Sequence, residues 1–145
     1  VFDFGSTWEH YYSDMTRTVY VGEPSEEYRK VYETVLQANA AAKAAVRPGA
    51  TCESIDRAAR DVIEAAGYGE YFIHRLGHGL GLDVHEEPYM VSGNTTELKP
   101  GMVFSDEPGI YIPGKFGVRI EDILVCTEDG YESLNNAPRD LTVMD

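Results

Sequence analysis

The chain has 145 residues, of which 43% are hydrophobic, so it can bury one sizeable core, and this composition argues against extended disorder. Its 25 acidic and 12 basic residues give a formal charge of -13 at pH 7, which disfavours binding to nucleic acid and to anionic membrane surfaces. Its two cysteines, Cys52 and Cys126, make neither a disulfide framework nor a C-x-x-C metal pair, and they suit a cytoplasmic protein.

The N-terminal residues predict a β-hairpin. Residues 1–4 are β-like, Gly5 is expected to break the strand, and aromatic and β-branched residues resume over 10–21. Such a hairpin would place Asp3 and Asp14 on neighbouring strands.

Two helices are expected next. Apolar residues keep helical spacing after Pro24, and this first helix is expected to end at Pro48-Gly49. Thr51 can cap the second helix, and Gly67 is expected to terminate it in the left-handed conformation. Both helices have the pattern of ordinary packing elements.

The second half of the chain has the sequence pattern of β-strands. Strands are expected in three apolar runs, which cover residues 77–85, 102–112 and 117–126. Pro113-Gly114 predicts a turn, and residues 128–130 predict another before a final short strand. The order of elements predicts an α+β domain, with helices packed on one face of a curved antiparallel sheet.

Five polar side chains interrupt the apolar strands. They are Asp3, Asp14, His78, Glu107 and Glu121. Four carboxylates with few arginines beside them would leave uncompensated negative charge in a core, so a bound cation is expected. An oxygen-rich set with one imidazole favours Mn²⁺, Co²⁺ or Fe²⁺ over a closed structural zinc site. Five side chains suit two ions roughly 3.5–4 Å apart, a pair that supports hydrolysis.

These motifs resemble those of the metallopeptidases of the creatinase and methionine aminopeptidase superfamily, whose fold is called pita-bread. The resemblance is closest to prolidases and Xaa-Pro aminopeptidases. It is carried by the segments 3–5, 12–18, 77–86, 107–111 and 117–122, and the two aspartates have the expected gap of 14 - 3 = 11 residues. The resemblance implies that residues 1–145 are the C-terminal major portion of a catalytic domain with a pita-bread fold, whose N-terminal part is missing.

The resemblance also implies the ligand set of a dinuclear centre. Asp3 would bind one ion, His78 and Glu107 would bind the other, and Asp14 and Glu121 would bridge both. The ions are expected to be Mn²⁺, with Co²⁺, Fe²⁺ or Zn²⁺ as alternatives. A water that bridges the ions would attack the peptide bond.

Other residues receive roles from the same resemblance. Glu107 would shuttle the proton, His85 would stabilise the developing oxyanion, and His74 matches the family's other histidine on the substrate side. Tyr111 and Arg119 would orient the ligand carboxylates.

The function implied is hydrolysis of a peptide with proline at the second position, by an Xaa-Pro aminopeptidase or an Xaa-Pro dipeptidase. The complete protein would form a homodimer. The alternatives are a methionine aminopeptidase-like or creatinase-like hydrolase and a catalytically silent interaction module. The presence of all five donors favours the metal-dependent peptidase.

Structural explanations compete at individual positions. His74 and His78 have the spacing of a helical zinc pair, but the glycines around His78 argue against a helix. Residues 3–5 also spell the magnesium triplet of kinases, but the glycine-rich and catalytic loops of kinases do not precede them. Asp106 and Asp122 should point to the opposite face from their glutamate neighbours, and we interpret both as non-ligands.

Overall fold

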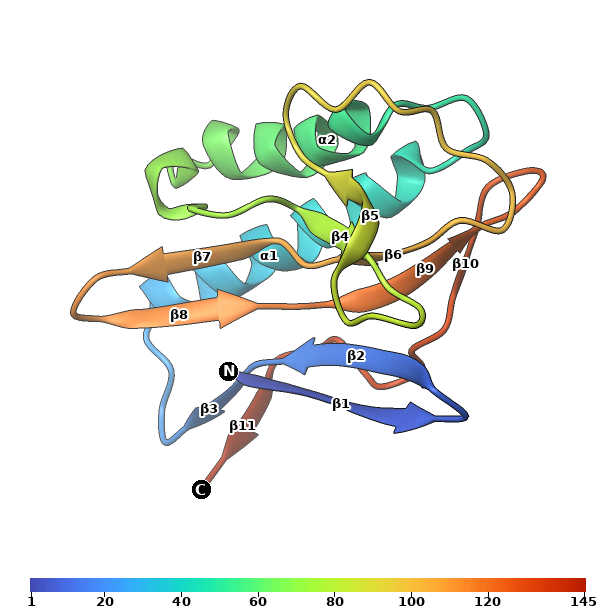
Figure 1. The fold of residues 1–145 in the computed structure, drawn as a ribbon. Helices are drawn as coiled ribbons and strands as arrows, with labels where there is room; N and C mark the ends of the chain where they lie inside the picture. The colour runs from blue at the N-terminus through green and yellow to red at the C-terminus, as the bar shows by residue number, and fades with distance from the viewer.

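The computed structural model describes residues 1–145 as three layers, with two helices, a central antiparallel sheet and a separate β-hairpin (Figure 1). The helices are α1 (Glu26–Ala45) and α2 (Cys52–Ala65), followed by the 3₁₀ turn η1 (Gly69–Tyr71). The strands are β1 (Phe2–Trp8), β2 (Tyr11–Arg17), β3 (Val19–Val21), β4 (Gly77–Gly79), β5 (Glu86–Met90), β6 (Val103–Asp106), β7 (Gly109–Ile112), β8 (Phe116–Arg119), β9 (Asp122–Cys126), β10 (Tyr131–Ser133) and β11 (Thr142–Met144).

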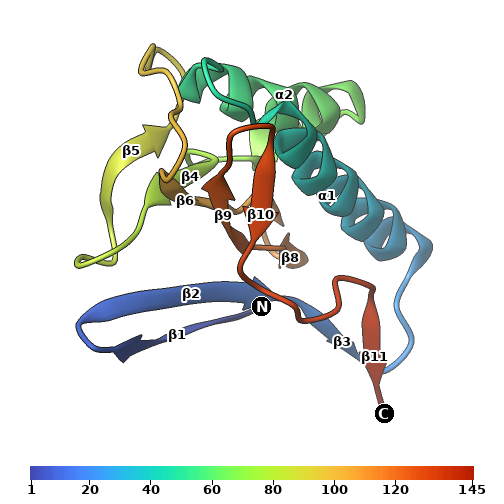
Figure 2. The ribbon, with the colours of Figure 1, turned by 90° about the vertical axis from the view of Figure 1, so that its right-hand side faces the viewer.

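The central sheet has five strands in the order β10-β9-β6-β4-β5, and every neighbouring pair is antiparallel. Helices α1 and α2 cover one face of it, and the β1–β2 hairpin lies on the other side (Figures 1 and 2). The α+β architecture expected from the sequence is therefore confirmed. One feature was not predicted: strand β11, near the C-terminus, pairs in parallel with β3.

The helix boundaries follow local capping chemistry. The side chains of Ser25 and Thr51 accept hydrogen bonds from the backbone N–H three residues further on, which satisfies an otherwise unpaired donor of each helix. Gly67 has φ +86°, as predicted for a left-handed terminator. Helix α1 ends at Ala45, slightly before the predicted stop at Pro48-Gly49.

The core lies between the helices and the central sheet. It contains fully buried side chains from both layers, such as Val35, Ile55, Leu76, Phe104 and Leu124. Every residue of β1, by contrast, is exposed. None of the helices combines the length and apolar character that crossing a bilayer would require.

The hairpin differs from the prediction at its glycine. Gly5 does not break the strand but lies inside β1, directly opposite Asp14. A side chain at this position would collide with the backbone carbonyl of Ser13, so glycine lets the two strands approach closely. The chain reverses at Glu9 and His10, which both have positive φ, at 48° and 72°.

The strands of the second half are shorter than predicted. The run 77–85 is a strand only at Gly77–Gly79, and the other two runs are each interrupted, at Glu107-Pro108 and at Ile120-Glu121. Proline has no N–H for a ladder hydrogen bond, which explains the first interruption. Both predicted glutamate ligands therefore lie at breaks between strands rather than inside them.

Candidate metal centre

The hairpin brings its two aspartates to one face. Asp3 pairs with Thr16 and Asp14 pairs with Gly5, so the aspartates are diagonal neighbours across the two strands. Strand β2 then joins the central sheet through a bridge between Thr16 and Glu121, and the Thr16 hydroxyl donates to Glu121 Oε2 at 2.5 Å. This β-bridge places Asp14 of the hairpin close to Glu121 of the sheet layer, the two side chains predicted to bind both ions.

The central sheet supplies the nitrogen donor. His78 lies in β4 and is 2% exposed, and its Nδ1 is 3.0 Å from the carbonyl oxygen of Gly79. An N–H on Nδ1 would donate to that oxygen and leave the Nε2 lone pair free for a metal. His78 Nε2 lies 3.3 Å from Glu107 Oε1 and 3.9 Å from Asp14 Oδ2. Glu107 also accepts a hydrogen bond from the Ser105 hydroxyl at 3.1 Å.

The predicted donors therefore lie together. Potential ligand atoms of Asp14, His78 and Glu121 are all within 4.8 Å of one another. Glu107 adjoins them through His78, and Asp3 lies diagonally across the hairpin from Asp14. The sequence separates these side chains by as much as 121 - 3 = 118 positions, and the meeting of hairpin and sheet makes them neighbours.

The electrostatics of this cluster fit a cation. Burial raises the pKa of Glu107 to about 7, and burial together with the neighbouring Glu107 raises the pKa of Glu121 to about 8. Burial, and then the nearby Asp3, raises the pKa of Asp14, while burial lowers the pKa of His78. A divalent ion bound here would stabilise the ionised form of these carboxylates and would bind the neutral form of the His78 imidazole.

A chain of hydrogen bonds runs alongside the carboxylates. His74 Nε2 is 3.0 Å from the hydroxyl of Tyr111, which accepts a hydrogen bond from Arg119 Nη1 at 3.0 Å. Arg119 forms a close ion pair with Asp3, and its Nε donates to the Thr16 hydroxyl at 3.1 Å. Arg119 thus contacts the predicted ligand Asp3 directly, whereas Tyr111 is linked to it through Arg119 and His74 through Tyr111.

His85 lies on the open side of the cluster. Its ring centroid is 4.3 Å from that of His78, in an edge-on arrangement. Together with Asp3 and Asp14 it lines a hollow of about 420 Å³, large enough to receive part of a peptide. His85 is therefore placed to contact a molecule that enters from this side.

The sequence reasoning overlooked the side chains that connect the layers. Thr16 follows Asp14 by two residues and so shares its face of β2, a signal that strand alternation could have provided. Asp106 and Asp122 point away from the cluster, as predicted. Asp122 is fully buried and contacts Arg17, Lys43 and Arg139 on the helix side of the sheet.

Comparison with known proteins identifies a family and several relatives. Residues 1–128 match the metallopeptidase family M24. The probable dipeptidase PepE of Mycobacterium tuberculosis is 54% identical over 145 residues, which cover 99% of this chain and 39% of that protein. The Xaa-Pro dipeptidase of Lactobacillus helveticus is 52% identical over 144 residues, with the same two coverages, 99% and 39%. The crystal structure of a recombinant prolidase from Thermococcus sibiricus superposes with a TM-score of 0.96 at 54% identity, covering 98% of this chain and 39% of that one. The chain thus spans 39% of the length of these relatives.

Proposed function

The chain belongs to metallopeptidase family M24, and on this premise we propose that the complete protein hydrolyses the peptide bond between a residue and a following proline. The observation that carries the proposal is the convergence of Asp14, His78 and Glu121 within 4.8 Å, with Glu107 and Asp3 beside them. An interaction module without catalysis would have no need to hold the buried Glu121 so close to the half-buried carboxylates of Asp14 and Glu107.

We propose the ligand assignment that the family resemblance implies, and the clustering of the side chains supports it. Asp3 would hold one divalent ion, His78 and Glu107 the second, and Asp14 and Glu121 would be shared. Oxygen-rich donors with one imidazole suit Mn²⁺ first, with Co²⁺, Fe²⁺ and Zn²⁺ as alternatives. When bound, such a pair supplies Lewis acidity and a nucleophilic water at neutral pH.

The surrounding side chains would handle the proton and the substrate. Glu107 would take up the proton of the attacking water at a carboxylate oxygen and pass it to the leaving amine. Its other contact, from the Ser105 hydroxyl, holds the carboxylate in place. His85 would donate to the developing oxyanion from the hollow beside the cluster, and His74 would assist from the Tyr111 side.

The peptidase domain would be larger than the part described. We propose that residues 1–145 form the C-terminal major portion of the catalytic domain, since the relatives are longer than the aligned segment. The complete protein is proposed to be a homodimer that acts on peptides in the cytoplasm and binds neither nucleic acid nor membranes.

An activity assay of the complete protein tests the function. After metal depletion it should hydrolyse neither Ala-Pro nor Ala-Pro-Ala, and added Mn²⁺ should restore turnover. Cleavage of Ala-Pro alone would assign a dipeptidase, and cleavage of the tripeptide would assign an aminopeptidase. Asp14→Asn should abolish the restored turnover while keeping the fold, because it removes a shared anionic ligand. Full turnover in this variant, or in the presence of a chelator, would refute the proposal.

A further inference from the structure

The segment after β10 lies against β2, which carries Asp14, and against the start of β9, directly after Glu121. Asn135 makes the most direct link, because its Nδ2 donates to the backbone carbonyl of Asp14 at 3.2 Å. Its Oδ1 accepts from the backbone N–H of Ile123 at 2.5 Å, two residues after Glu121. One amide side chain thus joins the hairpin to the central sheet.

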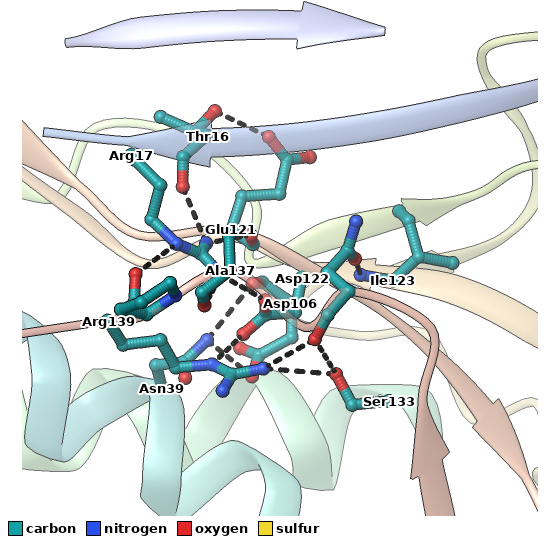
Figure 3. A network of polar contacts seen from close by, with 12 residues as sticks. Thr16, Arg17, Asn39, Asp106, Glu121, Asp122, Ile123, Ser133, Ala137 and Arg139 are labelled. Atoms are coloured by element: carbon teal, nitrogen blue, oxygen red, sulfur yellow. Dashed lines mark hydrogen bonds and ion pairs between the residues drawn. The ribbon is translucent and has the colours of Figure 1, made fainter. Parts of the chain in front are cut away.

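Arg17 also connects the hairpin to the central sheet and to the segment after β10 (Figure 3). Its Nη1 donates to the carbonyl of Glu121 at 2.6 Å, and its Nη2 donates to Asp122 Oδ1 at 2.8 Å. The Nη2 and Nε groups also donate to the carbonyls of Ala137 and Pro138, both at 2.9 Å. Arg17 belongs to β2, so its guanidinium holds the hairpin, the start of β9 and the C-terminal segment together.

Asp122 anchors this arrangement in the core. It is fully buried, and Oδ2 accepts from Lys43 Nζ and Arg139 Nε, both at 2.5 Å. Arg139 Nη2 also donates to the carbonyl of Asn135 at 3.0 Å. Glu121 points up to Thr16, while Asp122 points down toward α1, so adjacent residues connect the proposed centre to this network (Figure 3).

The network matters because apolar packing does little to hold the hairpin. Strand β1 is exposed throughout. Strand β2 makes backbone hydrogen bonds to other layers: the N–H of Glu121 donates to the carbonyl of Thr16 at 3.1 Å, and the N–H of Tyr12 donates to the carbonyl of Gly81 at 2.9 Å. Shared ligands must be held within roughly 0.5 Å of their productive positions. The polar links of Asn135 and Arg17 therefore bear on the separation of Asp14 and Glu121.

We propose that Asn135 is a positioning residue of the metal centre and, with Arg17, sets the separation of Asp14 and Glu121. The inference rests on the proposed function, since it concerns the ions that this function requires. Asn135 itself touches neither ion nor substrate. It acts through the backbone of Asp14 and through the start of β9.

Mn²⁺ binding to the complete protein tests this role, measured by calorimetry and by electron paramagnetic resonance, which is sensitive to the separation of two Mn²⁺ ions. Asn135→Asp keeps the shape and the acceptor for Ile123 N–H but loses the donor to Asp14, whereas Asn135→Ala loses both. Both variants should bind Mn²⁺ roughly 10- to 100-fold more weakly, with an altered resonance spectrum. Asn136→Ala is the matched control, because Asn136 is the exposed neighbour, and it should bind as the wild type does.

The outcomes separate the two proposals. If the wild type binds Mn²⁺ and both Asn135 variants match its affinity and spectrum below their melting temperatures, the positioning role is overturned and the proposed function stands. A lower Tm with unchanged Mn²⁺ affinity also overturns it, since Asn135 would then serve stability alone. If the wild type binds no divalent ion, the proposed function fails first and the positioning role falls with it.

Discussion

The β1–β2 hairpin and the central sheet contribute to the same candidate centre, yet they are held in different ways. Every residue of β4, which carries His78, is buried, whereas every residue of β1, which carries Asp3, is exposed. The sheet rests on the core beneath α1 and α2, where Phe104 and Leu124 are fully buried. The hairpin is attached largely by polar contacts around Thr16, Arg17 and Asn135. One half of the centre is thus built by apolar packing and the other by a few directional contacts.

The largest expected difference between the two regions is in stability. Phe104→Ala in β6 should lower the free energy of unfolding by about 3–5 kcal/mol, because it opens a cavity in the core. Thr7→Ala in exposed β1 should change it by less than about 0.5 kcal/mol. Urea unfolding of both variants measures the contrast. Equal losses would show that the hairpin is as tightly integrated as the sheet.

The pH dependence of the metal-free protein probes the buried glutamates next. Glu107 and Glu121 have an ordinary pKa of 4.5, which rises to about 7 and about 8 in the folded protein. These two side chains therefore bind more protons in the folded than in the unfolded state between these pKa values. Their contribution to stability is full below pH 4.5 and is lost as the pH rises to 8. The loss should be on the order of a few kcal/mol.

Thermal unfolding at pH 5, 6.5 and 8 with chelator present would show this decline. Added Mn²⁺ should reverse it, because ionised carboxylates bind the metal at the higher pH. Glu121→Gln is the control, since a neutral amide removes one of the two titrating groups and should flatten the decline. A metal-free wild type that becomes more stable from pH 5 to pH 8 would contradict the assigned burial effect.

A smaller effect is expected at the hydroxyl that joins the two regions. Thr16→Val keeps the side-chain shape but removes the donor to Glu121 and the acceptor for Arg119 Nε. Mn²⁺ affinity should fall about 10-fold or more, and stability should fall by about 1–3 kcal/mol. Thr16→Ser retains the hydroxyl and should bind Mn²⁺ close to wild-type affinity in calorimetry. Weak binding by the serine variant would shift the explanation to packing.

The smallest expected effect is in the hairpin turn. His10 has φ 72°, a conformation that costs a residue with a side chain roughly 1–2 kcal/mol. His10→Gly should relieve part of this cost and slow hydrogen exchange of the hairpin amides. His10→Ala should bring no such gain, because it keeps the Cβ. Similar protection in both variants would mean that the imidazole, not the backbone, limits the turn.

Much of the architecture could be predicted locally. Ser25, Thr51 and Gly67 mark the helix ends through capping and left-handed geometry, which depend on a few neighbouring residues. The family resemblance is confirmed by the match over residues 1–128. The prediction that Gly5 breaks the strand was wrong. Glycine is required there because the backbone of Ser13 lies close to it across the hairpin, a contact that the local sequence does not reveal.

The sequence alone determined which side chains could form a centre, because charged residues inside apolar runs require a partner and their motifs resemble one family. The assignment of each ligand to an ion stays a prediction. Tertiary structure decided what brings the donors together: the bridge of Thr16 to Glu121, and the links of Arg17 and Asn135 between segments more than a hundred residues apart. Those contacts have no local pattern, since a hydrogen bond between distant segments depends on how the layers pack and not on the spacing of residues along the chain.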